Sequence, residues 1–187
     1  MAQITDLYIY PVKSLKGITL TEAQTAKRGL EFDREWMVTD DQYNFISQRE
    51  IELMTTIETG IDSLSLILTS NNQKVLKIPL NSSRSNKVRA MVWDDVCDGF
   101  DEGDPASRWL TDVLGTYGGS ALRLVRFDQE GERPVPKKYL DGVHAESAFS
   151  DQFPYLITSW ESLSKLNTGL SENDSFEVSM NRFRPNI

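Results

Sequence analysis

The residues best suited to chemistry lie in the last segment of the chain, Arg182-Phe183-Arg184-Pro185-Asn186-Ile187. Two arginines flank an aromatic residue, and a proline then restricts the backbone before an asparagine. The planar guanidinium of arginine donates to phosphate or carboxylate oxygens in pairs, so this pattern favours an anion site. We therefore interpret Arg182, Arg184 and Asn186 as candidate anion contacts. Ile187 is typical of an apolar strand that continues, so we expect the chain to be the front part of a longer protein.

A second cationic segment, Tyr10 to Gly17, joins two expected strands near the start of the chain. It places an amine (Lys13), a hydroxyl (Ser14) and backbone N–H groups in one turn, which suits an oxyanion. The alternative is a solvent-facing hairpin loop, and spacing alone favours it because Lys and Ser are common in turns.

Arg34 lies in a run of alternating charge beside Phe32 and Trp36. It could point inward to an anion while Asp33 or Glu35 orients it. The alternative is a ladder of surface ion pairs along a strand, which contributes little to stability. Taken by itself, the segment favours the ladder.

Three further candidates lie between residues 151 and 159. Thr158 and Ser159 stand where an expected strand gives way to a helix, and helix N-termini present free N–H groups to anions. The commoner outcome for Ser159 is to cap that helix. Asp151 offers a carboxylate that could accept hydrogen bonds from the N–H groups of a heterocycle, or it is simply a turn residue.

The chain has one histidine, His144, and one cysteine, Cys97. A single histidine in a polar loop does not make a His-rich metal site. A single cysteine excludes an internal disulfide framework and a multi-cysteine metal site. Acidic neighbours also disfavour a reactive thiolate at Cys97. We assign no catalytic residue and no metal ligand.

Composition limits the partners. The 187 residues are 39% apolar, enough to bury the core of one large domain or two small ones. The net charge of −8 argues against nucleic acid or an anionic membrane as the main partner, although it allows a local basic pocket. The start of the chain resembles no signal peptide, and its apolar runs are far shorter than the ~20 residues that span a bilayer. We expect a cytoplasmic protein.

The fold is expected to be mainly β, with an α+β second part. Short strands separated by polar turns predict a small barrel or sandwich in the first half; we place them at residues 4–10, 18–24, 35–39, 45–47, 64–69, 75–78, 87–93 and 96–100. Asp104 as N-cap and Pro105 predict a helix that runs to Gly115. A strand (122–127), a polar loop (128–147), a strand (154–158) and a helix after Ser159 follow. We place a domain boundary between residues 1–101 and 102–187.

Taken together, four segments resemble the MOSC-domain family, in the branch where an N-terminal β-barrel (MOSC_N) precedes the MOSC domain. That branch includes bacterial YcbX-type proteins and the mitochondrial amidoxime-reducing component. The resemblance spans nearly the whole chain and keeps the order of the motifs, which are Tyr10–Gly17, Phe32–Trp36, Ser150–Ser159 and Asn181–Ile187.

The resemblance implies a molybdenum cofactor, bound in the full-length parent through its pterin and phosphate. It implies that Lys13, Ser14 and Arg34 hold one side of the cofactor. The further contacts implied, at the helix start and the pocket floor, are Asp151, Thr158, Ser159, Arg182, Arg184 and Asn186.

In this family a cysteine thiolate downstream of the Arg-Pro-Asn motif ligates the metal, and the chain ends before that position. Cys97 lies upstream and is not that ligand. The resemblance implies a parent that reduces small N-hydroxylated compounds with electrons from a partner reductase or an iron–sulfur domain. We expect no turnover from these residues alone.

Two alternatives remain open. The barrel could be a non-catalytic module that binds a substrate or a protein partner. Broad descriptions of the superfamily also allow sulfur delivery or pyridoxal-phosphate chemistry, with Lys13 as the Schiff-base lysine. A pocket shared by Lys13, Arg34 and Ser159 would favour the cofactor hypothesis.

Overall fold

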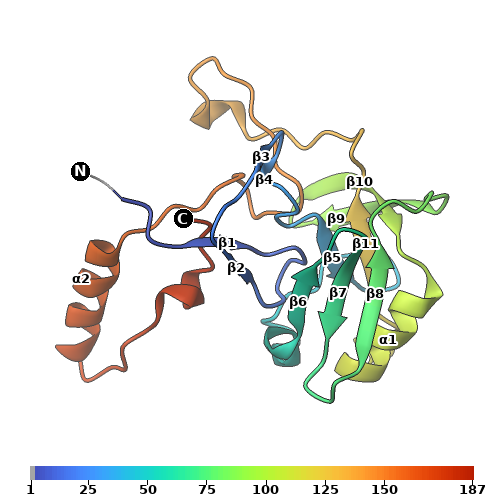
Figure 1. Ribbon diagram of the computed structural model, residues 1–187, viewed down its shortest axis with the longest axis horizontal. Helices are drawn as coiled ribbons and strands as arrows, with labels where there is room; N and C mark the ends of the chain where they lie inside the picture. Colours follow the sequence, from blue (N-terminus) through green and yellow to red (C-terminus); the bar gives the residue numbers. More distant parts are fainter. Residues whose placement is uncertain (1–2) are drawn as a thin grey trace.

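The computed structural model describes residues 3–187, which are mainly β-structure with two α-helices (Figure 1). The helices are α1 (Asp104–Leu114) and α2 (Trp160–Ser171). The strands are β1 (Leu7–Ile9), β2 (Ile18–Leu20), β3 (Thr25–Ala26), β4 (Gly29–Leu30), β5 (Trp36–Thr39), β6 (Glu58–Ile61), β7 (Ser65–Thr69), β8 (Val75–Pro79), β9 (Lys87–Val92), β10 (Asp95–Asp101) and β11 (Arg123–Phe127).

Two antiparallel sheets and α1 enclose the main core, as the expected small barrel requires. One sheet has the order β5-β11-β10-β9 and the other β6-β7-β8. In β7 and β8 every second residue is buried, so Leu66, Leu68, Leu76 and Ile78 point into the core. Figure 1 shows α1 beside this sheet, and its buried Leu110 closes the core.

The four-stranded sheet is covered on both faces, which is why β5 is buried at every position. Trp36 and Val38 face the barrel core, whereas Met37 faces a second core. Phe149, from the segment after the long loop, closes that second core, and its ring meets Phe127 edge to face at 5.3 Å. The sheet thus connects the barrel to residues 147–150, which border the candidate site.

The two predicted helices are confirmed, with one change at a cap. Ser159 caps α2, since its hydroxyl accepts a hydrogen bond from Ser162 N at 3.2 Å. Gly115 follows α1 as predicted, but Gly103 is its N-cap, with no side-chain hydrogen bond. The carboxylate of Asp104 instead accepts a hydrogen bond from Arg123 at 3.0 Å.

The hairpin of β7 and β8 and the pair β9 and β10 are confirmed, whereas the predicted strand at 154–158 is wrong. The backbone there is irregular, although Leu156 O accepts from Asn186 N at 2.8 Å and Thr158 N donates to Ile187 O at 2.9 Å. Pro154 and Pro185 have no N–H to extend this pairing into a ladder. The short strands β3, β4 and β6 were not predicted.

The boundary after residue 101 stays a prediction. Residues on both sides of it share one sheet, because β11 lies between β5 and β10. Within residues 3–187 neither helix is long and apolar enough to cross a bilayer.

Candidate functional site

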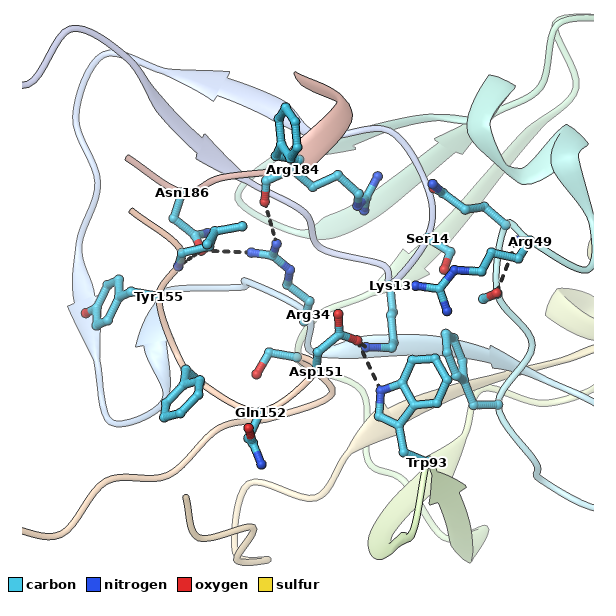
Figure 2. A pocket seen from close by; sticks show the side chains of 17 residues that line it. Lys13, Ser14, Arg34, Arg49, Trp93, Asp151, Gln152, Tyr155, Arg184 and Asn186 are labelled. Carbon is cyan, nitrogen blue, oxygen red and sulfur yellow. Dashed lines mark hydrogen bonds and ion pairs between the residues drawn. The ribbon is translucent and has the colours of Figure 1, made fainter. Parts of the chain in front are cut away.

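A cavity of about 400 Å³ lies where the loop after β1, the β9–β10 turn and the segments around residues 151 and 185 meet (Figure 2). We call it the Lys13 cavity. Four cationic side chains line it, against one acidic one, so it is a positive site in an acidic chain. Its lining is Lys13, Ser14, Arg34, Phe45, Ser47, Gln48, Arg49, Trp93, Ser150, Asp151, Gln152, Phe153, Tyr155, Leu156, Phe183, Arg184 and Asn186.

Lys13 is buried, and its Nζ donates to Asp151 Oδ1 at 2.6 Å. The same amine lies 4.9 Å from the centre of the Phe45 ring and 5.7 Å from that of Trp93. Burial lowers the pKa of Lys13 to about 8, and the ion pair with Asp151 offsets only part of that effect. The amine therefore changes charge near physiological pH.

The partner carboxylate is far less buried, with 74% of the Asp151 side chain exposed. Its Oδ1 also accepts from Trp93 Nε1 at 3.1 Å. Partial burial would raise the pKa of Asp151, but Lys13 and the Trp93 hydrogen bond lower it below its ordinary value. Asp151 thus stays ionised and satisfies Lys13 in the absence of a ligand anion.

Arg34 is fixed by hydrogen bonds. Its guanidinium donates to Asp33 Oδ2 at 2.5 Å. It also donates to Asn186 Oδ1 at 3.0 Å and to Arg184 O at 2.8 Å (Figure 2). Arginine has five N–H donors, so part of the fork stays free for a ligand. Asp33 is buried and its other oxygen accepts from Tyr10 N at 2.8 Å, which ties Arg34 to the loop after β1.

Asn186 joins the segments that form the cavity through hydrogen bonds. Its side chain is buried, accepts from Arg34 and from Leu156 N at 3.1 Å, and donates to Tyr8 O at 3.1 Å. Its backbone N–H and C=O bond to the same two neighbours, Leu156 and Tyr8. Asn186 therefore links three distant segments and positions Arg34.

Arg184 is the least satisfied cation of the site. Its Nη2 is buried and has no hydrogen-bond partner within residues 3–187. Burial, and secondly the charge of Arg34, lower the pKa of Arg184 to about 10, so it remains protonated at neutral pH. A buried guanidinium without a partner is costly, and an anionic ligand would satisfy it.

Four residues that line the cavity have left-handed backbone conformations: Ser14 (φ 71°), Arg34 (φ 51°), Trp93 (φ 54°) and Arg184 (φ 56°). They are half of the eight such non-glycine residues in the described part of the chain. Each costs on the order of 1–2 kcal/mol relative to ordinary backbone, and such residues gather at functional sites.

The structure brings six predicted site residues into this one cavity, namely Lys13, Ser14, Arg34, Asp151, Arg184 and Asn186. Three others do not line it. Ser159 caps α2, the Thr158 hydroxyl lies 3.4 Å from Ile187 O, and Arg182 is exposed. Cofactor contacts by these three stay predictions.

Phe45, Arg49 and Trp93 also line the cavity, although no sequence motif marks them as site residues. Arg49 is exposed, and its guanidinium lies 5.6 Å from the Trp93 ring. Tryptophan is an unusual residue for a tight turn such as that between β9 and β10, and this is the one sequence signal that could have identified Trp93. No spacing pattern marked Arg49.

Within residues 3–187 no group of three or more His, Cys, Asp or Glu side chains is arranged to hold a metal ion.

Comparison with known proteins identifies relatives of the chain. The family model for the "MOSC N-terminal beta barrel domain" matches residues 1–117. Human mitochondrial amidoxime-reducing component 1 and rat mitochondrial amidoxime reducing component 2 are each 31% identical over 98% of this chain and 55% of their own lengths. Human molybdenum cofactor sulfurase is 26% identical over 98% of this chain and 22% of its own. The chain thus spans about half the length of the amidoxime-reducing relatives.

Proposed function

Because this chain belongs to the family of MOSC N-terminal beta barrel domains, we propose that its Lys13 cavity holds the phosphate-bearing pterin of a molybdenum cofactor. The relatives' names include an amidoxime-reducing activity and a molybdenum cofactor sulfurase. The observation that carries the proposal is the buried, unpartnered Nη2 of Arg184 in a cavity with four cations and one carboxylate.

The residues present fit such a group. A phosphate monoester carries two charges and accepts hydrogen bonds, which the free donors of Arg184, Arg34 and Lys13 would provide. A pterin is flat and aromatic, and aromatic side chains, Phe45 and Trp93 among them, line the same cavity. The volume of about 400 Å³ lies in the usual range for small-ligand sites.

The chain's own residues bind and orient rather than react. Arg34 and Arg184 would neutralise the phosphate, and Asn186 would keep Arg34 in place. When the ligand anion pairs with Lys13, the ion pair between Lys13 and Asp151 would weaken. The Asp151 carboxylate would then accept hydrogen bonds from pterin N–H groups. When bound, the molybdenum cofactor supplies the oxygen-atom and electron transfer that side chains cannot perform.

For the whole protein we propose reduction of small N-hydroxylated compounds, as the names of the amidoxime-reducing relatives suggest. Electrons would come from a partner reductase or an iron–sulfur domain. The role of the described residues in that reaction is electrostatic anchoring of the cofactor.

The test compares two arginines of one motif. The chain is purified from cells that make the molybdenum cofactor, and the retained pterin is measured by fluorescence after oxidation. We expect Arg184→Ala to lower pterin content at least tenfold, because a lost charged hydrogen bond costs about 1.5–3 kcal/mol. Exposed Arg182→Ala, whose side chain does not line the Lys13 cavity, is the matched control and should retain pterin, contrary to the contact that the resemblance implies.

Equal pterin loss in both variants would reject the assignment of the cavity as the binding site. Absence of pterin from the wild-type chain, together with no affinity for inorganic sulfate as a phosphate mimic, would reject the proposal. That result would favour the non-catalytic binding module.

A further inference from the structure

Tyr10 contacts both arginines of the cavity, although it does not line the cavity itself. The centre of its ring lies 4.4 Å from Cζ of Arg34 and 4.2 Å from Cζ of Arg184. The residue is only 3% exposed, so both contacts are shielded from water. A cation within about 6 Å of an aromatic face is attracted by the ring, and more strongly where water is excluded.

The two arginines are held in different ways. Hydrogen bonds to Asp33, Asn186 and a backbone carbonyl orient Arg34. Arg184 Nη2 has no hydrogen-bond partner among the described residues, and its guanidinium carbon lies over the Tyr10 ring. Stacking uses the face of the guanidinium and leaves its N–H groups, which lie in the plane, available to a ligand.

The loop after β1 is built to admit this ring. A Cβ atom at Gly17 would lie 2.5 Å and 2.8 Å from two ring carbons of Tyr10, so any larger residue would displace the ring. The backbone of Tyr10 is also tied to Arg34, because Arg34 N donates to Tyr10 O at 2.8 Å. The ring therefore has a defined place relative to the anion site.

We propose that Tyr10 is a positioning residue of the anion site: its ring holds Arg184 by stacking, so that the guanidinium N–H groups face a doubly charged oxyanion. This inference rests on the proposed function, since it concerns the same cavity. Tyr10 and Gly17 would thus affect ligand binding without contacting the ligand: Gly17 leaves space for the Tyr10 ring, and the ring positions Arg184.

The test is a double-mutant cycle on the 187-residue chain, with inorganic sulfate as the probe in isothermal titration calorimetry. We expect Tyr10→Leu to weaken sulfate binding about tenfold and Tyr10→Phe to change it less than about twofold, because Phe keeps the ring face. If Tyr10 acts through Arg184, Tyr10→Leu has no further effect in the Arg184→Ala background.

Wild-type affinity in Tyr10→Leu would overturn the inference, and so would the same loss in both backgrounds. Failure of the wild-type chain both to retain pterin and to bind sulfate would instead reject the proposed anion site, so the two failures are distinguishable. Thermal unfolding and near-UV circular dichroism check each fold. If Tyr10→Leu does not fold, Gly17→Ala replaces it in the same cycle, since it keeps the ring but displaces it.

Discussion

The cationic residues of the Lys13 cavity lose their charge at different pH values. Burial lowers the pKa of Lys13 to about 8, whereas Arg184, whose pKa falls only to about 10, stays protonated at neutral pH. A lysine with a lowered pKa is fully charged well below that value and neutral well above it. The Lys13 amine is therefore the group of the cavity that titrates under mild conditions.

We expect the affinity for sulfate to fall as the pH rises from about 7 to about 9, through the lowered pKa of Lys13 and below that of Arg184. Sulfate keeps its two charges over this range, so any change arises from the protein. Calorimetric titration at several pH values measures the effect, and Lys13→Arg is the matched control, with a nearly flat profile. A flat profile for the wild-type chain would contradict the role of Lys13.

Of the two α-helices, α2 has fewer buried residues than α1. Leu163 is its one buried residue, and Figure 1 shows the helix standing away from the barrel. Such a helix depends strongly on its cap, because few tertiary contacts support it. Ser159 supplies that cap.

We expect Ser159→Ala to destabilise α2 by about 1 kcal/mol without changing sulfate affinity. Hydrogen exchange of the α2 amides measures the first effect and calorimetry the second, and Ser159→Asp should keep the cap. A loss of sulfate binding as large as that of Arg184→Ala would show that the cavity extends to the helix start.

The elements also show how far sequence alone leads. Two short apolar runs on either side of Asn71-Asn72 predict β7 and β8, and Pro105 and Gly115 mark α1, because these signals act within a few residues. Residues 154–158 were wrongly predicted to form a strand. Their irregular backbone pairs with Asn186, about 30 residues away, and local sequence signals do not reveal such a partner. For the same reason the motifs identify six cavity residues but not Arg49, whose place depends on the fold.

The whole molecule combines a net charge of −8 with one strongly positive cavity. Its single cysteine, Cys97, lies in the second core, 2% exposed. Burial raises the pKa of this thiol to about 11, so it is neither charged nor accessible in the folded chain. The thiol is therefore a natural reporter of global unfolding.

We expect Ellman's reagent at pH 7.5 to modify Cys97 only as the chain unfolds. The rate of modification across a guanidinium series should follow the unfolding curve measured by circular dichroism, and Cys97→Ser gives the background. Modification in native buffer at the rate of a free thiol would mean that the second core opens locally.

Asn186 connects residues that are 178 positions apart, because its side chain donates to Tyr8 O. Contacts of such long range form late, after local hairpins such as β7–β8 have paired. During synthesis the barrel strands emerge well before Asn186, so a partly made chain has its core strands but not its binding site. A chain that retains the ligand has therefore already joined β1 to the segment around Asn186.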